Sequence, residues 1–259
     1  MTMTMQVKVL GCSGGIGGDL RTTSLLVGEH VLIDAGTGVC DLPLEALLKI
    51  DHVFITHAHL DHIAALPLLL DSALGLREKP ITVHAHSGTI EALKTHVFNW
   101  AIWPDFNQIP SCEQPFLEYA ALELGQSLAL PGVIITALPA NHVVPALGYQ
   151  IDGGERSLVF TGDTAGSVNF WQCVNHISNL EYLIIETAFS NAEAELAKVS
   201  KHLCPQTLVA ELVQSKRQLQ TYITHLKPGE GEVIMQEIAA NPHTRHCKAL
   251  QHNQLFELS

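Results

Sequence analysis

The segment THAHLDH, residues 56–62, places three imidazoles and one carboxylate within six consecutive residues, 57–62. A short apolar run, Val53-Phe54-Ile55, precedes it, and a second apolar run begins at Ile63. These flanks predict a buried strand before the segment and a buried helix after it. Surface histidines fit poorly between two buried elements, so the pattern favours a metal site and is far more specific than a lone GxGxxG.

The spacing within this segment indicates two ions. In extended backbone alternate side chains point the same way, so His57 and His59 can bind one ion. Asp61 and His62 lie where the chain turns into the helix and can reach a second ion. Imidazole and carboxylate ligands suit zinc first, with manganese or iron as alternatives. Two such ions can share a hydroxide that is nucleophilic near neutral pH.

Further ligand candidates follow other predicted strands. His142 comes just after a strand predicted over 132–140, and Asp163 lies in the Gly-Asp-Thr that follows the run SLVF. His225 comes just after the predicted strand at 220–223. Side chains just past the ends of buried strands are held rigidly, which a metal site requires.

Composition limits the class of protein. Hydrophobic residues make up 47% of the 259 residues and charged residues 15%, and no internal repeat or linker interrupts the chain, so we expect a single domain over residues 1–259. The first twelve residues lack the pattern of a secretory signal, and no apolar run is long enough to cross a bilayer, so we expect a cytoplasmic protein without membrane contact. The six scattered cysteines indicate free thiols rather than disulfides or a zinc knuckle.

The order of predicted elements indicates an α/β protein with two sheets packed face to face and helices outside. Asp41 is expected to cap a helix over 41–48, and a final strand pair is expected near 250–258. The other strands are predicted at 6–12, 25–27, 31–34, 53–55, 81–83, 132–140, 147–151, 157–161, 182–185 and 220–223. Further helices are predicted from Ile63, at 88–98, from Gly166, at 207–215 and at 230–239.

HxHxDH, a later lone His, a Gly-Asp-Thr and a final Thr-His together resemble the metallo-β-lactamase superfamily over nearly the whole chain. The resemblance implies an αββα four-layer sandwich with the metals at one edge. It assigns His57, His59 and His142 to one ion, Asp61, His62 and His225 to the other, and Asp163 to both. A carboxylate at the bridging position is similar to the phosphodiesterase branch, where a cysteine would resemble the β-lactamases.

Longer stretches resemble the class II 3′,5′-cyclic-nucleotide phosphodiesterases. They are HAHLDHIAALPLLLDS from residue 57, FNWAIWPDF from 98, IIETAFSN from 184, KHLCP from 201 and YITHLKP from 222. Ala65 departs from the glycine that this family often shows there, which puts only the local helix packing in doubt. The tRNA 3′-processing endonucleases share the metal motifs, but the chain lacks their basic arm for tRNA.

Three further groups are candidate site residues. By resemblance, His202 faces the scissile phosphate and assists the leaving oxygen. Glu186 ends a buried strand and can orient His202 or a ligand. With Asp61, which is also a ligand, these are the expected catalytic residues. An aromatic loop offers either a platform for a purine base or a satellite core, and its members are Phe98, Trp100, Trp103 and Phe106.

The resulting hypothesis is a phosphodiesterase that hydrolyses cAMP or cGMP to the 5′-nucleotide, with two divalent ions as cofactors and a bridging hydroxide as nucleophile. Fourteen Lys+Arg against 26 Asp+Glu, a formal net charge of -12, argue against gripping long nucleic acid. The alternatives are a phosphodiesterase for tRNA or a cyclic dinucleotide, a thioester or lactone hydrolase, and a non-catalytic metal sensor. The oligomeric state stays open, with a homodimer among the options.

Overall fold

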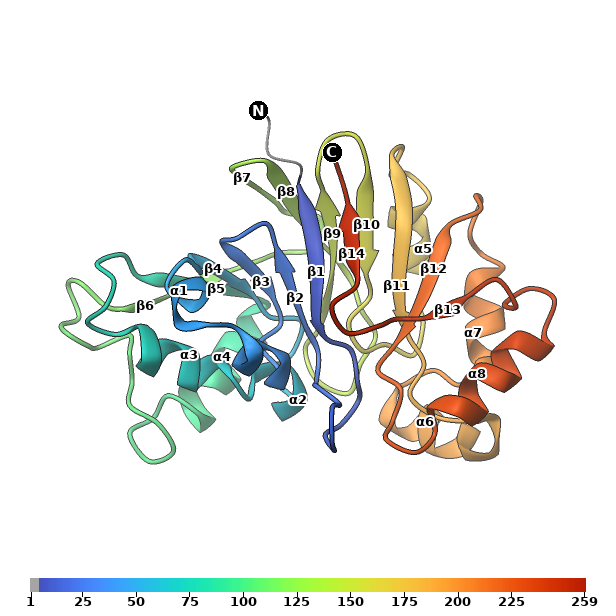
Figure 1. The fold of residues 1–259 in the computed structure, drawn as a ribbon, viewed down its shortest axis with the longest axis horizontal. Helices are drawn as coiled ribbons and strands as arrows, with labels where there is room; N and C mark the ends of the chain where they lie inside the picture. The colour runs from blue at the N-terminus through green and yellow to red at the C-terminus, as the bar shows by residue number, and fades with distance from the viewer. Residues whose placement is uncertain (1–4) are drawn as a thin grey trace.

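Two seven-stranded sheets form the centre of the molecule (Figure 1), in a computed structural model that describes residues 5–259. The first four residues of the predicted domain therefore lie outside the description. The first sheet runs, in spatial order, through β14 (Leu255–Glu257), β1 (Gln6–Gly11), β2 (Ser24–Val27), β3 (Val31–Ile33), β4 (His52–Phe54), β5 (Ile81–Ala85) and β6 (Leu117–Ala121).

The second sheet, like the first, contains both parallel and antiparallel strands. It runs through β13 (Lys248–Ala249), β12 (Gln220–Thr224), β11 (Leu180–Glu186), β10 (Ser157–Phe160), β9 (Leu147–Asp152), β8 (Val133–Pro139) and β7 (Ser127–Leu130). In each sheet one half is antiparallel and the other half, β3 to β6 or β10 to β13, is parallel. The carboxyl ends of parallel strands meet at one edge, where the chain enters its longer connections.

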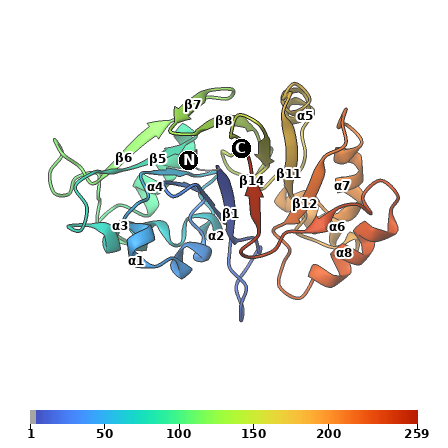
Figure 2. The ribbon, with the colours of Figure 1, turned by 45° about the horizontal axis from the view of Figure 1, so that its top comes forward.

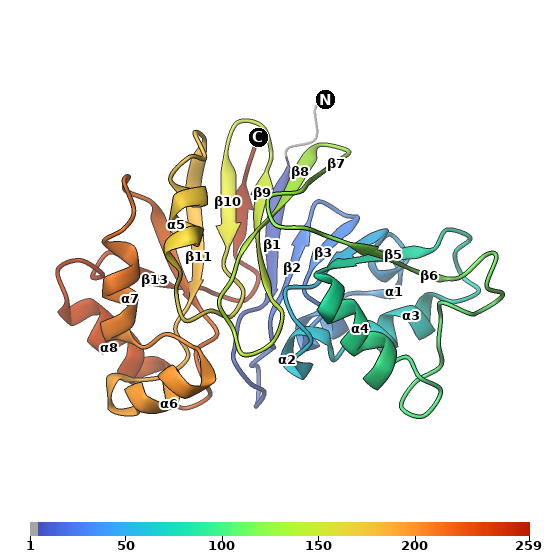
Figure 3. The ribbon, with the colours of Figure 1, turned by 180° about the vertical axis from the view of Figure 1, so that it is seen from behind.

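Helices cover the outer faces of both sheets (Figures 2 and 3). Beside the first sheet lie α1 (Leu44–Leu47), α2 (Leu60–Ile63), α3 (Leu66–Ala73) and α4 (Ser87–His96). Beside the second lie α5 (Val168–Val174), α6 (Ala194–Ser200), α7 (Pro205–Leu212) and α8 (Gly231–Ala240). The predicted αββα sandwich is confirmed.

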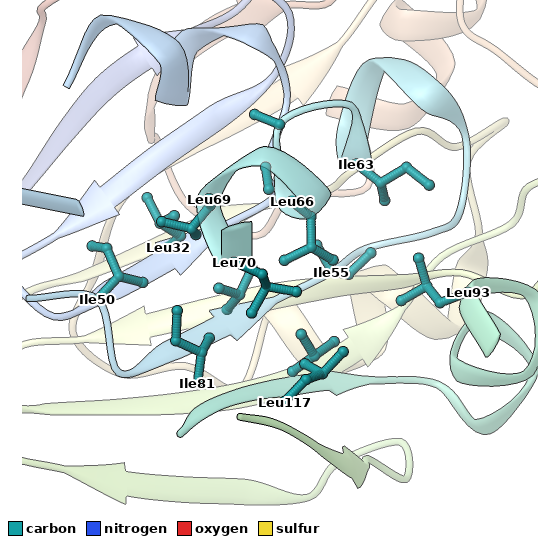
Figure 4. Packing of buried hydrophobic residues seen from close by; sticks show 14 of the residues in the cluster. Leu32, Ile50, Ile55, Ile63, Leu66, Leu69, Leu70, Ile81, Leu93 and Leu117 are labelled. Carbon is teal, nitrogen blue, oxygen red and sulfur yellow. The ribbon is translucent and has the colours of Figure 1, made fainter. Parts of the chain in front are cut away.

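Alternation along the strands explains the four layers. Leu32 packs with the α3 residue Leu66 on the outer face of the first sheet (Figure 4), whereas its neighbours Val31 and Ile33 join the core between the sheets. In β11, likewise, Ile184 belongs to the core between the sheets, and the residues on either side of it face the helices. A strand with apolar side chains on both faces must be covered on both sides.

Two local predictions are wrong. Asp41 caps no helix, because α1 begins after Pro43 and the Asp41 carboxylate instead accepts a 2.8 Å bond from Arg21. The final strands do not pair with each other: β13 joins the second sheet and β14 joins the first. The prediction also omitted β6, β7 and α6. Within residues 5–259, every helix is too short or too polar to span a bilayer.

A pair of histidines, buried His84 and half-buried His52, lies in the first sheet away from the predicted ligands. The His84 ring stacks on Phe54 with ring centroids 4.5 Å apart, and its Nε2 lies 3.0 Å from Nδ1 of His52. Burial lowers the pKa of His84 to about 4, and the neighbouring His52 adds to the shift. The folded chain therefore holds His84 neutral at a pH where an unfolded histidine, with a pKa near 6.5, takes up a proton.

His84→Phe should make the stability of the protein less sensitive to acid. The stabilisation from neutral His84 is present above pH 6.5 and is lost as the pH falls toward 4, because the unfolded state then binds the extra proton. Between about pH 7.5 and about pH 5.5, the wild type should lose about 1 kcal/mol more unfolding free energy than the variant in urea titrations. Parallel stability curves for the two proteins would contradict this account.

Candidate metal centre

All the predicted ligands meet at one edge of the sandwich. His57 to His62 follow β4, His142 follows β8, Asp163 follows β10 and His225 follows β12. Figure 1 shows α2, which follows His59, and α6, which precedes His202, at this same lower edge, opposite the C-terminus. The strand ends therefore bring together residues up to 168 positions apart, from 57 to 225.

The first group of ligand atoms combines three imidazoles with one carboxylate: His57, His59, His142 and Asp163. Nε2 of His57 lies 3.0 Å from Nδ1 of His59, which lies 3.2 Å from Nε2 of His142. Oδ2 of Asp163 is 3.6 Å from Nε2 of His57.

The second group shares Asp163 with the first and adds Asp61, His62 and His225. Nε2 of His225 lies 3.0 Å from Oδ2 of Asp61 and 3.2 Å from Oδ2 of Asp163. The other Asp163 oxygen, Oδ1, is 3.4 Å from Nε2 of His62. Asp163 is 2% exposed and belongs to both groups, so its carboxylate is placed to bridge two ions.

These spacings fit divalent cations. Ligand atoms about 2.0–2.1 Å from a tetrahedral zinc ion lie roughly 3.3 Å apart, close to the separations in both groups. Nε2 of His62 is buried and has no hydrogen-bond partner among the described residues, although it faces the Asp163 carboxylate. A buried ring nitrogen without a hydrogen-bond partner costs free energy unless it binds a cation. The residues present therefore fit a two-ion site.

Partners on the outer ring nitrogens fix three of the histidines. Nδ1 of His62 lies 2.7 Å from the Asp34 carboxylate, which also accepts a 2.7 Å bond from the Thr56 amide. Nδ1 of His57 lies 3.0 Å from Oγ1 of Thr56, and Nδ1 of His142 lies 3.1 Å from the carbonyl oxygen of Lys201. Such contacts set the ring orientation and raise the affinity for metal.

Electrostatics prepare the same groups for ligation. Burial lowers the pKa of His57 well below its ordinary value and that of His142 to about 4, so both rings are neutral. Burial disfavours the charged form of Asp163, but the positive charge of His225 and His62 outweighs burial and holds its pKa well below the usual range. Burial likewise opposes charge on His62, yet the carboxylates of Asp163 and Asp34 raise its pKa. The centre therefore attracts positive charge, as a cation site must.

His202 lies beside this centre and is held by Glu186. Its Nδ1 is 2.8 Å from Oε1 of Glu186, which is fully buried and also accepts from the amides of Thr164 and Leu203. The His202 ring stacks on His225, with centroids 5.1 Å apart. Burial lowers the pKa of His202, but the hydrogen bond and charge of Glu186 outweigh burial and raise it.

Of the two alternatives for the aromatic loop, a platform for a base and a satellite core, the second describes most of its residues. Phe98 and Phe106 are each 1% exposed and belong to the core under α3 and α4, with their rings edge to face. Trp103 packs against the same core, and of the four only Trp100, 61% exposed, presents a free face. The satellite-core alternative therefore describes Phe98, Trp103 and Phe106, because buried rings leave no surface for a base.

Sequence reasoning missed two contributors. Lys201 has left-handed backbone, with φ 54°, and its Nζ donates to the His142 carbonyl at 2.9 Å, so it holds His142 from both sides. The second is the glycine turn that follows β1, where Gly14 packs directly against His225. The run of glycines between residues 11 and 18 was the available signal for a close approach.

Comparisons with known proteins agree with this geometry. The profile of the family described as beta-lactamase superfamily domain matches residues 29–230. A ribonuclease Z of Haloarcula marismortui is 29% identical over 174 residues, 63% of this chain, which spans 52% of that protein's length. A probable 3′,5′-cyclic-nucleotide phosphodiesterase of Yersinia pestis is 28% identical, covering 88% of this chain and 79% of that protein. The structure of unliganded yeast PDE1 has a TM-score of 0.79 at 17% identity, covering 98% of this chain and 99% of that one, and so shares the fold.

Asp163→Ala should empty both ion positions together. Asp163 is the residue common to both groups, so its loss removes a ligand from each and leaves His62 and His57 without their facing carboxylate. We expect about two ions per wild-type chain by elemental analysis, a large loss of metal in the variant, and inactivation of the wild type by strong chelators. A variant that kept both ions would show that Asp163 does not bridge them.

Proposed function

Because the chain belongs to the beta-lactamase superfamily, we propose that its paired centre hydrolyses 3′,5′-cyclic nucleotides, cAMP or cGMP, to 5′-nucleotides. One observation carries the proposal: a buried carboxylate bridges two ligand groups, and a histidine fixed by Glu186 stands beside them. A carboxylate in place of a thiolate would leave the bound ions harder Lewis acids, which suits the hard oxygens of a phosphodiester. The relatives support the general class of enzyme, phosphodiesterases and nucleases of the metallo-β-lactamase fold, whereas the specific substrate is our proposal.

The residues of the site divide the reaction between them. Two divalent ions, zinc by preference, would supply charge to the phosphate oxygens and activate water for attack near neutral pH. His57, His62 and His142, whose rings are oriented by Thr56, Asp34 and Lys201, would hold that charge in a fixed place. His202 uses Nδ1 for Glu186, which leaves Nε2 to donate a proton to the departing ribose 3′ oxygen.

A cavity beside His142 is the proposed place for the base and ribose. It has a volume of about 600 Å³, within the range typical of small-ligand sites. Its lining is rich in polar side chains, among them His86, Glu123, Asn141, Ser167 and Asn169. Nδ1 of His86 accepts from the Gly88 amide, which leaves Nε2 as the ring nitrogen that can donate. Donors and acceptors of this kind suit the edge of a nucleobase.

Processing of tRNA 3′ ends is the second candidate, favoured by the ribonuclease Z relative. The charges oppose it. Fourteen Lys+Arg stand against 26 Asp+Glu, and a polynucleotide needs many cationic phosphate contacts. Two lysines lie in the segments that carry site histidines, and both donate to backbone carbonyls: Lys201 to His142 and Lys227 to Gly14.

A substrate panel separates the candidates. Purified protein would be assayed on cAMP, cGMP, bis-p-nitrophenyl phosphate, a tRNA precursor with a 3′ trailer, and a lactone. We expect turnover of a cyclic nucleotide and of the nitrophenyl diester, abolished by chelation, with Asp163→Ala as the blank for contaminating enzymes. Cleavage of the tRNA precursor without any cyclic-nucleotide turnover would replace the proposal with the second candidate.

His202→Ala should separate proton donation from metal binding. The variant should keep the full metal complement, and its kcat on the cyclic nucleotide should fall about 10²–10⁴-fold. The loss should be smaller on bis-p-nitrophenyl phosphate, because nitrophenolate leaves without a proton.

His243→Ala, which changes an exposed histidine, is the matched control and should behave as wild type. Equal losses on both substrates would assign His202 to phosphate binding instead. Loss of metal in His202→Ala would make it a ligand and contradict the proposed set.

A further inference from the structure

The glycine turn after β1 is bonded to the segment that carries His225. The His225 amide donates to the Cys12 carbonyl at 2.8 Å, and the Gly14 amide donates to the Leu226 carbonyl at 3.1 Å. Nζ of Lys227 donates to the Gly14 carbonyl at 2.9 Å. These bonds join the end of β1 in the first sheet to the end of β12 in the second, at the metal edge.

Gly14 leaves no room for a side chain. A Cβ atom there would lie 2.6 Å from the carbonyl oxygen of His225 and 2.7 Å from Nδ1 of its ring. Both distances are shorter than any ordinary van der Waals contact, and one of the two atoms is backbone. His225 itself has left-handed backbone, with φ 63°, a conformation that costs a non-glycine residue free energy and persists only where its surroundings impose it.

His225 differs from the other buried ligands in how its ring is held. The outer nitrogens of His57, His62 and His142 each have a hydrogen-bond partner. Nδ1 of His225 is buried, and no residue of the range 5–259 forms a hydrogen bond with it. The ring instead lies between His62 and His202, nearly parallel to both, with its Nδ1 side against Gly14. Its position therefore depends on packing.

We propose that Gly14 is a positioning residue that selectively controls occupancy of the second ion site, formed by Asp61, His62, Asp163 and His225. Packing against the bare glycine backbone sets the ring of His225, so any side chain there displaces one ligand of this site. The first group, His57, His59 and His142 with Asp163, has no contact of this kind with the turn. The inference rests on the two-ion centre proposed above and is independent of the substrate.

The test compares metal stoichiometry in Gly14→Ala and in a matched control. Gly231→Ala adds the same methyl group nearby, where the new Cβ would lie an ordinary 3.6 Å from Leu226. In titrations of metal-free protein with zinc, followed by calorimetry and elemental analysis, the wild type and Gly231→Ala should bind two ions. Gly14→Ala should bind one ion normally and the other about 10–100-fold more weakly.

Double variants identify the weakened site. In the Gly14→Ala background, His142→Ala should remove the remaining tight ion, and His62→Ala should leave it in place. If Gly14→Ala fails to fold, Lys227→Met keeps the glycine, removes the bond that holds its carbonyl, and should also weaken one ion of the two.

The outcomes distinguish this inference from the metal centre itself. Two tight ions in both Gly14→Ala and Lys227→Met, or equal weakening of both ions, would overturn the role of Gly14 while the centre stands. A wild-type chain that binds no zinc would overturn the centre and this inference with it.

Discussion

The bridging position of Asp163 is the constraint on which the rest of the structure depends. A buried carboxylate is costly unless positive charge compensates it, and Asp163 lies within 4 Å of ring nitrogens from His57, His62 and His225. His225 belongs to the same sheet as Asp163, whereas His57 and His62 come from the other, so the carboxylate is fully compensated only when the sheets are packed together. Folding and assembly of the centre are therefore linked, and ions bound only by the folded chain would stabilise it further.

The sandwich meets this constraint by ending its strands at one edge. β4 belongs to one sheet and β8, β10 and β12 to the other, and each is followed closely by a ligand. The residues that hydrogen-bond to the ligands also lie just after strands or helices. Asp34 follows β3 and holds both His62 and the Thr56 amide, whereas Lys201 follows α6 and holds His142. Short loops on rigid strands carry most of the ligand set, because a metal site tolerates little positional error.

The sequence predicts this edge well where the signal is local. His57, His59, Asp61 and His62 lie within six consecutive residues, so their spacing alone predicts the metal site. The pattern of apolar residues in the strands predicts two sheets that are each covered on both faces. Contacts between residues that are far apart in the sequence leave no local pattern from which they could be predicted. The aromatic loop has the composition of a base platform, but burial of Phe98 and Phe106 is decided by the helices above them. Gly14 and His225 are more than two hundred residues apart in the sequence, and no repeating pattern of residue types predicts their contact.

The ligand set alone does not choose a substrate, because the same imidazoles and carboxylates serve any phosphodiester that reaches them. The relatives include a ribonuclease Z and a probable cyclic-nucleotide phosphodiesterase. Selection must therefore depend on groups around the centre. A polynucleotide carries a charge at every nucleotide and is repelled by a chain of net charge -12 wherever cations do not line its path. A cyclic mononucleotide has a single phosphate, which the proposed ions would bind, and beyond it offers only ribose and base. Under the proposed function, neutral donors and acceptors such as those beside His142 would recognise the ribose and base, so the net negative charge would oppose a small ligand less than a polymer.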